Sequence, residues 1–182
     1  MKSFVFMLLF GVFLFYTLLN GEYHTSVVMP QYVMHETIED NSTVLPSSIL
    51  LDNTRVEDNL TQVTDMIALA KSKIGSPYVY AKTGPDSFDC SGFVYYLFGE
   101  HNISIARTSI DQSKQGIPLN KEDIRKGDIL FFDTSEKGHV NHSGLYLGED
   151  KFIHASSGKA KGVTISDLNG WYKDKFLWGI RR

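Results

Sequence analysis

The stretch Phe88–Phe98, FDCSGFVYYLF, decides the fold and holds the only cysteine of the 182-residue chain. Asp89 is a favourable N-cap, and apolar residues recur after it at helical spacing, so the stretch predicts a helix whose first residue is Cys90. Free backbone N–H groups and the positive end of the helix dipole would favour a thiolate there and could bind an oxyanion. Because the neighbouring Asp89 carboxylate opposes a thiolate, we expect the helix cap or a cationic substrate group to take up its charge.

A lone cysteine is more often a small buried apolar residue than a nucleophile. Two histidines later in the chain, His142 and His154, each lie in a strand-like run. A cysteine followed by such histidines is typical of nucleophilic catalysis, so we interpret Cys90 as a nucleophile.

The N-terminal residues predict a membrane-targeting segment. Lys2 precedes the uncharged apolar run Phe4–Leu19, the layout of a signal peptide or of an uncleaved signal-anchor helix. Small residues are poorly placed for cleavage, which favours the anchor. Residues 1–21 therefore predict an extracytoplasmic protein, either membrane-anchored or secreted.

Two further regions follow the targeting segment. Residues 22–58 are polar, contain two prolines, carry a formal charge of −6 and show no sustained period, so they predict a flexible tether. Residues 59–182 carry a charge of +2 and are long enough for one core, so we expect one domain and a monomer. The weakly basic domain shows no clustered Lys and Arg, which argues against dedicated binding to nucleic acid.

The order of elements within 59–182 indicates an α+β fold. Apolar periodicity and capping signals predict helices at 60–74, 90–98 and 109–115, with a short extended run at 75–80. Alternating patterns then predict strands at 128–132, 140–147, 151–155, 162–165 and 177–181. Helices first and strands second are typical of an antiparallel meander rather than of alternating βαβ units.

The loop between two of these strands decides whether the histidines meet. Period two places His142 and His154 on one sheet face if one or three residues, for example Gly148–Asp150, close the hairpin, or if a bulge interrupts it. A tight two-residue turn would place them on opposite faces. On one face, His142 can act as the base for Cys90, and His154 can orient the ring of His142.

A zinc site is the alternative interpretation of the same residues. Cys90, Asp89, His139, His142 and His154 are all ligand types for zinc. Their spacing contains neither a Cys-x-x-Cys nor a His-Glu-x-x-His core, so we predict no metal and no cofactor, and His139 becomes a loop residue.

Several motifs together carry a family resemblance, in one order from about Leu60 to Arg182. They are Gly75–Tyr78 (GSPY), Phe88–Val94 (FDCSGFV), Arg107–Ser109 with Gln112, Lys126–Phe132 (KGDILFF), His142–Gly148 (HSGLYLG) and Phe152–Ala155 (FIHA). This set resembles the NlpC family of papain-like cell-wall endopeptidases. The resemblance implies N-terminal helices packed on a five- to six-stranded antiparallel sheet, with Cys90 as nucleophile, His142 as base and His154 as the third, polar member.

The resemblance also implies a substrate. The family cleaves bacterial peptidoglycan stem peptides, typically between γ-D-glutamate and diaminopimelate or lysine. In members that require a free N-terminal amine, residues matching Tyr78, Asp89 and Ser91 line its subsite, which would give Asp89 an ammonium partner. Ala81-Lys82 stands where the family usually has two glycines, so we expect a reshaped loop beside that subsite.

Two other functions stay open on the sequence alone. Papain-like sites also cleave N-acylmuramoyl-alanine bonds or transfer acyl groups, so an amidase or acyltransferase is one alternative. A wall-binding module without turnover is the other, although the presence of Cys90, His142 and His154 together favours an enzyme.

Overall fold

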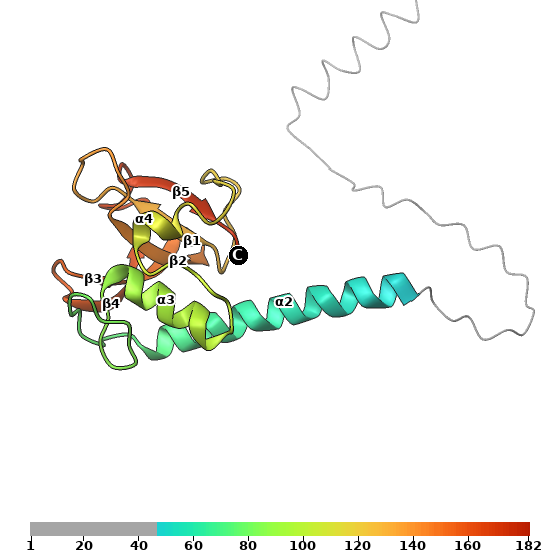
Figure 1. Ribbon diagram of the computed structural model, residues 1–182. Coiled ribbons are helices and arrows are strands. Elements are labelled where there is room, and N and C mark those ends of the chain that lie inside the picture. The colour runs from blue at the N-terminus through green and yellow to red at the C-terminus, as the bar shows by residue number, and fades with distance from the viewer. Residues whose placement is uncertain (1–46) are drawn as a thin grey trace, which may run out of the picture. The chain divides into compact units, whose positions relative to one another are not determined.

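The computed structural model describes residues 47–182, and their side chains from Arg55 onward (Figure 1). The predicted targeting segment and most of the predicted tether, residues 1–46, lie outside the described residues. Within 47–182, no helix combines the length and the apolar character needed to cross a membrane.

Helix α2, Ser47–Ser72, is longer than the sequence pattern predicted. It begins 13 residues before Leu60, so the last part of the predicted tether is helical. No glycine or proline occurs between Pro46 and Gly75, and nothing therefore interrupts the helix until Gly75 takes a φ of +87°. Its C-terminal half reaches the core, where Met66 and Ala70 are buried.

Helix α3, Cys90–Glu100, begins where the sequence predicted. Asp89 is the N-cap, and its Oδ1 accepts a hydrogen bond of 2.7 Å from the backbone N–H of Gly92. The C-cap is His101, so the helix runs two residues beyond the predicted end at residue 98. The third helix, α4, is a single turn, Ser109–Gln112, shorter than predicted and capped by Thr108.

Five antiparallel strands form one sheet in the order β4-β3-β2-β1-β5. Their bounds are Ile129–Phe132 for β1, His142–Gly148 for β2, Lys151–Ser156 for β3, Gly162–Asp167 for β4 and Phe176–Ile180 for β5. The first four make the predicted meander, and β5 returns to pair with β1. Helices followed by an antiparallel sheet confirm the α+β class.

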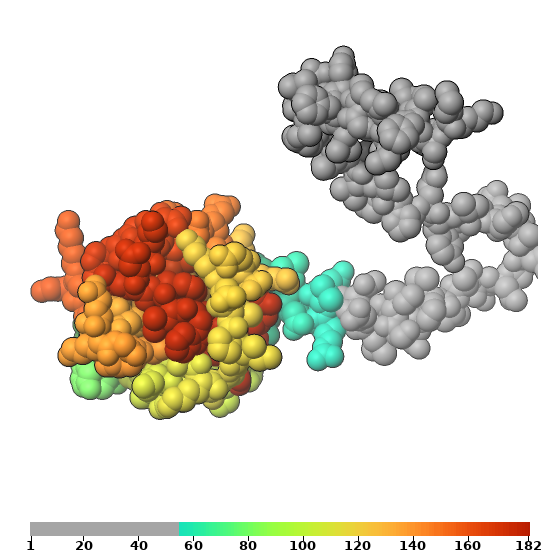
Figure 2. All heavy atoms as spheres, turned by 90° about the horizontal axis from the view of Figure 1, so that it is seen from above, coloured from blue at the N-terminus to red at the C-terminus, as the bar shows by residue number. Residues whose placement is uncertain are grey.

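Strand β1 lies between β2 and β5 in the sheet and has all four side chains buried. Ile129 and Phe131 face the cluster that contains the apolar side of α3, while Leu130 and Phe132 belong to a second cluster on the other sheet face. Because both faces of β1 are covered, its sequence is continuously apolar instead of alternating. The segment after α4 covers the β5 edge of the sheet, because the backbones of Leu119 and Gly179 form two hydrogen bonds with each other. Figure 2 shows this segment beside the C-terminal residues.

A bulge sets the register of the β2–β3 hairpin. Leu145 pairs with Ile153 and Tyr146 with Phe152, but Gly148 rather than Leu147 pairs with Lys151. The turn itself is the tight two-residue kind, with Glu149 and Asp150 both at φ +54°. The extra residue in β2 restores the register that a two-residue turn alone would have broken. Of the two solutions that the sequence allowed, the structure uses the bulge.

Candidate active site

Cys90 opens α3 beside the start of β2. Its Sγ lies 3.9 Å from the backbone carbonyl oxygen of Asn141, and the backbone N–H of Ser143 also acts on the thiol. These two residues flank His142 in the chain. The packing of α3 against β2 therefore brings the thiol to the His142 position, as the sequence predicted.

The two predicted histidines contact each other. His142 Nε2 lies 2.8 Å from His154 Nδ1, and His154 Nε2 lies 2.9 Å from Ser166 Oγ. If each ring donates from Nε2, His154 accepts a hydrogen bond from His142 at Nδ1 and donates one to Ser166 Oγ. That assignment leaves His142 Nδ1 free to accept a proton from a thiol.

A glycine between the two histidines makes their contact possible. Gly144 lies on β2, and a Cβ there would be 2.8 Å from the Phe152 ring and 3.1 Å from His154 Cβ. Any larger residue would push the His154 strand away. The glycine of the HSG motif thus has a packing role, because it lets two aromatic rings of β3 approach β2.

Burial sets the protonation state of the histidine pair. His142 is only 8% exposed, and burial lowers its pKa from 6.5 to about 4. Burial, followed by the proximity of His142, holds the pKa of His154 well below 6.5. Both imidazoles are therefore neutral at pH 7, because a charged ring would lose its hydration.

The thiol behaves differently from the sequence-based expectation. Burial raises the pKa of Cys90 above 9.0, and the Asp89 charge raises it further, while backbone N–H groups of Ser91, Ser143 and Cys90 lower it. The helix amides act in the predicted direction, but desolvation outweighs them. The resting site holds a neutral thiol and a neutral imidazole rather than the predicted thiolate.

The Asp89 carboxylate has two kinds of partner, the start of α3 and a cation. One oxygen caps α3, as predicted, and Arg107 forms a bidentate ion pair with both oxygens. The Arg107 guanidinium also donates to Ser91 Oγ at 3.0 Å. Arg107 belongs to one of the sequence motifs, but the motif alone indicates no role for it. The structure identifies Arg107 as the cation beside Asp89.

The predicted substrate residues meet in one cleft with the thiol. Tyr78, Asp89, Ser91, Arg107 and Cys90 all line a cleft of about 420 Å³, within the usual range for small-ligand sites. We call it the Asp89 cleft. Burial is the main cause that raises the pKa of Tyr78 above 10.0, so the phenol is neutral and can donate a hydrogen bond.

The Ala81-Lys82 loop borders this cleft. Ala81 has a φ of +63°, the left-handed region that glycine adopts most readily. The Lys82 carbonyl accepts a hydrogen bond of 2.9 Å from the N–H of Asp89. The chain thus uses a glycine-like backbone without the glycine, and the loop stays hydrogen-bonded to the N-cap of α3.

Three further residues support the site without having been predicted to do so. The fully buried Gln112 donates to the carbonyls of Ser91 and Ala106 and accepts from the Ser143 hydroxyl at 3.1 Å. Ser166 accepts from His154, and the Tyr172 ring lies 6.2 Å from the His142 ring in a stacked arrangement. Gln112 belongs to a sequence motif and could have been found from it. Ser166 lies one residue beyond the predicted strand 162–165, and no pattern in the sequence indicates Tyr172.

The predicted alternative of a zinc site has no geometric support in the part of the chain described. Within it, no three side chains of His, Cys, Asp or Glu are grouped to hold a metal ion. His139 is exposed, and its ring faces the Lys137 carbonyl at 3.3 Å, which places it in a loop.

Known proteins match this chain over the same region. A "Probable endopeptidase" of Haemophilus influenzae is 39% identical over 109 residues, 59% of this chain and 66% of that protein. A "Gamma-D-glutamyl-L-lysine dipeptidyl-peptidase" of Bacillus cereus is 39% identical over 106 residues, 58% of this chain and 32% of that protein. The chain thus spans between a third and two thirds of these relatives.

A solved structure shares the fold. It is an NlpC/P60 family protein from Bacillus cereus with a TM-score of 0.61 and 36% identity, covering 65% of this chain and 39% of that one. The sequence pattern of the NlpC/P60 family matches residues 75–182, which hold Cys90, His142, His154 and both strands of the bulged hairpin. The chain belongs to the NlpC/P60 family.

Proposed function

We propose that this protein is a cysteine endopeptidase that hydrolyses peptidoglycan stem peptides, with Cys90 as nucleophile, His142 as base and His154 as its orienting partner. The observation that carries the proposal is the chain of contacts that begins at a thiol beside His142 and continues through His154 to Ser166. The names of the relatives, endopeptidase and γ-D-glutamyl-L-lysine dipeptidyl-peptidase, support the same class of reaction.

The neutral resting pair implies general-base catalysis. The proton of Cys90 Sγ passes to His142 Nδ1 as sulfur attacks the amide carbonyl carbon, and the amide oxygen becomes an oxyanion near the first N–H groups of α3. His142 then gives this proton to the leaving amine, and the C–N bond breaks to leave a thioester. Water attacks the thioester with His142 again as base, which releases the acid and the thiol.

The Asp89 cleft fits the N-terminal side of the substrate. Its carboxylate, its hydroxyls and the neutral phenol of Tyr78 can together surround a free ammonium group. Arg107 already pairs with Asp89, but a carboxylate has about four lone-pair sites, so it can accept from an ammonium as well. The proposed bond joins γ-D-glutamate to diaminopimelate or lysine.

The proposed place of action is outside the cytoplasm. The apolar run Phe4–Leu19 supports delivery to the membrane, either as an anchor or as a cleaved signal. We propose that the protein works there as a monomer on the cell wall, without a metal or other cofactor.

The test is digestion of purified muropeptides, and of the free stem peptides prepared from them, by the full chain, followed by mass spectrometry of the products. We expect cleavage after γ-D-glutamate, and a Cys90→Ala variant that folds but releases no product. Cleavage at the N-acylmuramoyl-alanine bond would identify an amidase instead. Binding of muropeptides without turnover would identify a wall-binding module, and full turnover by Cys90→Ala would end the peptidase proposal.

A further inference from the structure

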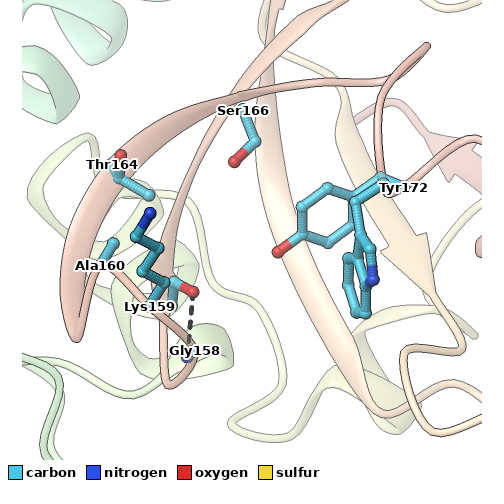
Figure 3. Close-up of a pocket in the computed structure, with 8 residues that line it drawn as sticks. Gly158, Lys159, Ala160, Thr164, Ser166 and Tyr172 are labelled. Atoms are coloured by element: carbon cyan, nitrogen blue, oxygen red, sulfur yellow. Dashed lines mark hydrogen bonds between the residues drawn. The ribbon is translucent and has the colours of Figure 1, made fainter.

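A second cleft lies on the other side of the histidine pair. It has a volume of about 810 Å³ and lies between the β3–β4 turn and the segment before β5. The side chains that matter here are Ser156, Lys159, Thr164, Ser166, Trp171 and Tyr172. Figure 3 shows the hydroxyls of Ser166 and Tyr172 pointing into the same space, with Lys159 across from them. We call it the Lys159 cleft.

The Lys159 cleft adjoins the proposed reacting groups. Ser166, which forms part of its wall, is hydrogen-bonded to His154. Tyr172, another wall residue, stacks on His142 and presents its edge to His154 with ring centroids 5.3 Å apart. Cys90 lines the Asp89 cleft, whereas the residues that contact the histidine pair, Ser166 and Tyr172, line the Lys159 cleft. The thiol and the histidine pair therefore lie between the two clefts.

The charge of the Lys159 cleft differs from that of the Asp89 cleft. Lys159 is the charged side chain of its lining, and no carboxylate among residues 55–182 forms an ion pair with it. A second ammonium, that of Lys175, lies 4.4 Å from the centre of the Trp171 ring at the cleft wall, but it is paired with Glu136 at 2.8 Å. Lys159 therefore supplies the charge of the cleft. A cleft lined by one ammonium and several hydroxyls attracts a carboxylate and repels a second ammonium.

We propose that the Lys159 cleft is the leaving-group subsite and that Lys159 binds a carboxylate on the residue that follows the scissile bond. This inference rests on the proposed function, because the Asp89 cleft must first hold the N-terminal side of the peptide. A peptide that enters the Asp89 cleft and passes Cys90 continues into the Lys159 cleft. The wall of Trp171 then covers the apolar stem of the leaving residue, and Lys159 meets its charged end.

The two leaving residues of the proposed substrate differ in this charge. Diaminopimelate carries a carboxylate at the end of its side chain, next to the ammonium, and lysine carries the ammonium alone. Amidation of that carboxylate removes its charge and changes little else. The protein should therefore prefer the diaminopimelate peptide over both the lysine peptide and the amidated one.

The experiment measures kcat/KM of the full chain on three tripeptides that differ only at this position. All begin with L-alanyl-γ-D-glutamate and end with diaminopimelate, its side-chain amide or lysine. We expect Lys159→Gln to lower kcat/KM on the diaminopimelate peptide by about 10-fold, as for loss of a charged hydrogen bond. The other two peptides should change by less than about twofold, and Lys159→Glu should favour the lysine peptide.

Lys161→Gln is the matched control, because it removes the same charge two residues away and outside the cleft. It should leave the preference unchanged. If Lys159→Gln affects all three peptides equally or none of them, or if the wild type prefers lysine, the subsite assignment is wrong and the peptidase proposal stands. If the wild type cleaves none of the three, the proposed function fails, and the inference fails with it.

Discussion

At Cys90, two effects act in opposite directions, and burial is the larger of them. The helix start supplies N–H groups that stabilise a thiolate, but burial and Asp89 stabilise the thiol and raise its pKa. The balance makes catalysis depend on His142, whose pKa of about 4 keeps it unprotonated and ready to accept. A base of low pKa is weak, so its orientation and its partner become important.

Ser166 is the residue that fixes this orientation through His154. Its hydroxyl accepts from His154 Nε2 at 2.9 Å, which keeps His154 Nδ1 free to accept from His142. We predict that Ser166→Ala lowers kcat by about 10-fold, as for other residues that orient a reacting group through a second one. The change in KM should be small, and Ser166→Thr should restore most of the rate.

A pH profile separates this role from a packing defect. Without the serine, His154 can change tautomer and meet water in the Lys159 cleft, so the pKa values of the histidine pair should rise. The acid limb of kcat should then move to higher pH in Ser166→Ala and return in Ser166→Thr. A profile that does not move, with an unchanged rate, would remove Ser166 from the proton path.

The sequence could predict some residues of the site but not their partners. Cys90, the Asp89 cap and the two histidines follow from local patterns, since cap preference and strand period act within a few residues. The partners of these residues do not. Arg107, Ser166 and Tyr172 reach the site from other segments, and only the packed structure determines which of several polar or aromatic residues arrives there.

At the scale of elements, the start of α3 depends on a close backbone contact. A Cβ at Gly92 would lie 2.1 Å from the carbonyl oxygen of Lys82, the same oxygen that accepts from the N–H of Asp89. The loop before α3 and its first turn can approach only because residue 92 lacks a side chain.

We predict that Gly92→Ala destabilises the domain by about 3 kcal/mol or more, since a backbone atom must move and the cap is lost with it. Gly99→Ala is the matched control on the same helix. A Cβ at Gly99 meets nothing within 4 Å, so alanine should be neutral or should stabilise by up to about 1 kcal/mol. Urea unfolding of both variants checks this, and equal effects at the two positions would contradict the role of the contact.

Element boundaries were predicted with uneven success for physical reasons. The strands and the start of α3 lie within two residues of prediction because turns and caps mark their ends. The start of α2 was missed because residues 55–61 are exposed, with Val56 and Leu60 at 60% and 68%, so this part of the helix has no apolar stripe. The sequence could not decide between a bulge at Leu147 and a loop of one or three residues, because either one gives the same strand pairing at the two histidines.

At the scale of the whole molecule, the buried histidine pair couples stability to pH. The folded pKa of His142 is about 4 and its ordinary value is 6.5, so the unfolded chain binds a proton first as pH falls. The contribution is complete above pH 6.5 and is lost on the way to pH 4. His154 acts in the same direction because its pKa is also depressed.

We predict that the free energy of unfolding falls by about 3 kcal/mol from His142 alone between pH 6.5 and pH 4. Urea unfolding at intervals of half a pH unit measures the slope. His142→Gln should flatten it in this window, whereas the exposed His139→Gln should leave it unchanged. An equally steep slope in His142→Gln would show that other groups cause the loss.

The extent of the folding unit is the last whole-molecule question, because the family pattern and the core do not begin at the same residue. The pattern begins at residue 75, but Met66 and Ala70 of α2 are 2% and 0% exposed and belong to the core around α3. Residues 55–61, by contrast, are all exposed. A fragment that begins at the sequence-based boundary, residue 59, therefore contains the complete core. A fragment that begins at the family boundary, residue 75, lacks the part of the core that α2 contributes.

We predict that the free energy of unfolding of fragment 59–182 lies within about 0.5 kcal/mol of that of fragment 47–182 and that its activity is kept, because it retains the buried Met66 and Ala70 of α2. Fragment 75–182 should lose about 4 kcal/mol or more, since removing Met66 alone from a packed core costs about 2–5 kcal/mol, and it should aggregate or show no cooperative transition. Parallel urea unfolding and light scattering of the three fragments decide between the boundaries. If 75–182 is as stable as 59–182, α2 lies outside the folding unit. If 59–182 aggregates while 47–182 does not, residues 47–58 of α2 belong to the folding unit.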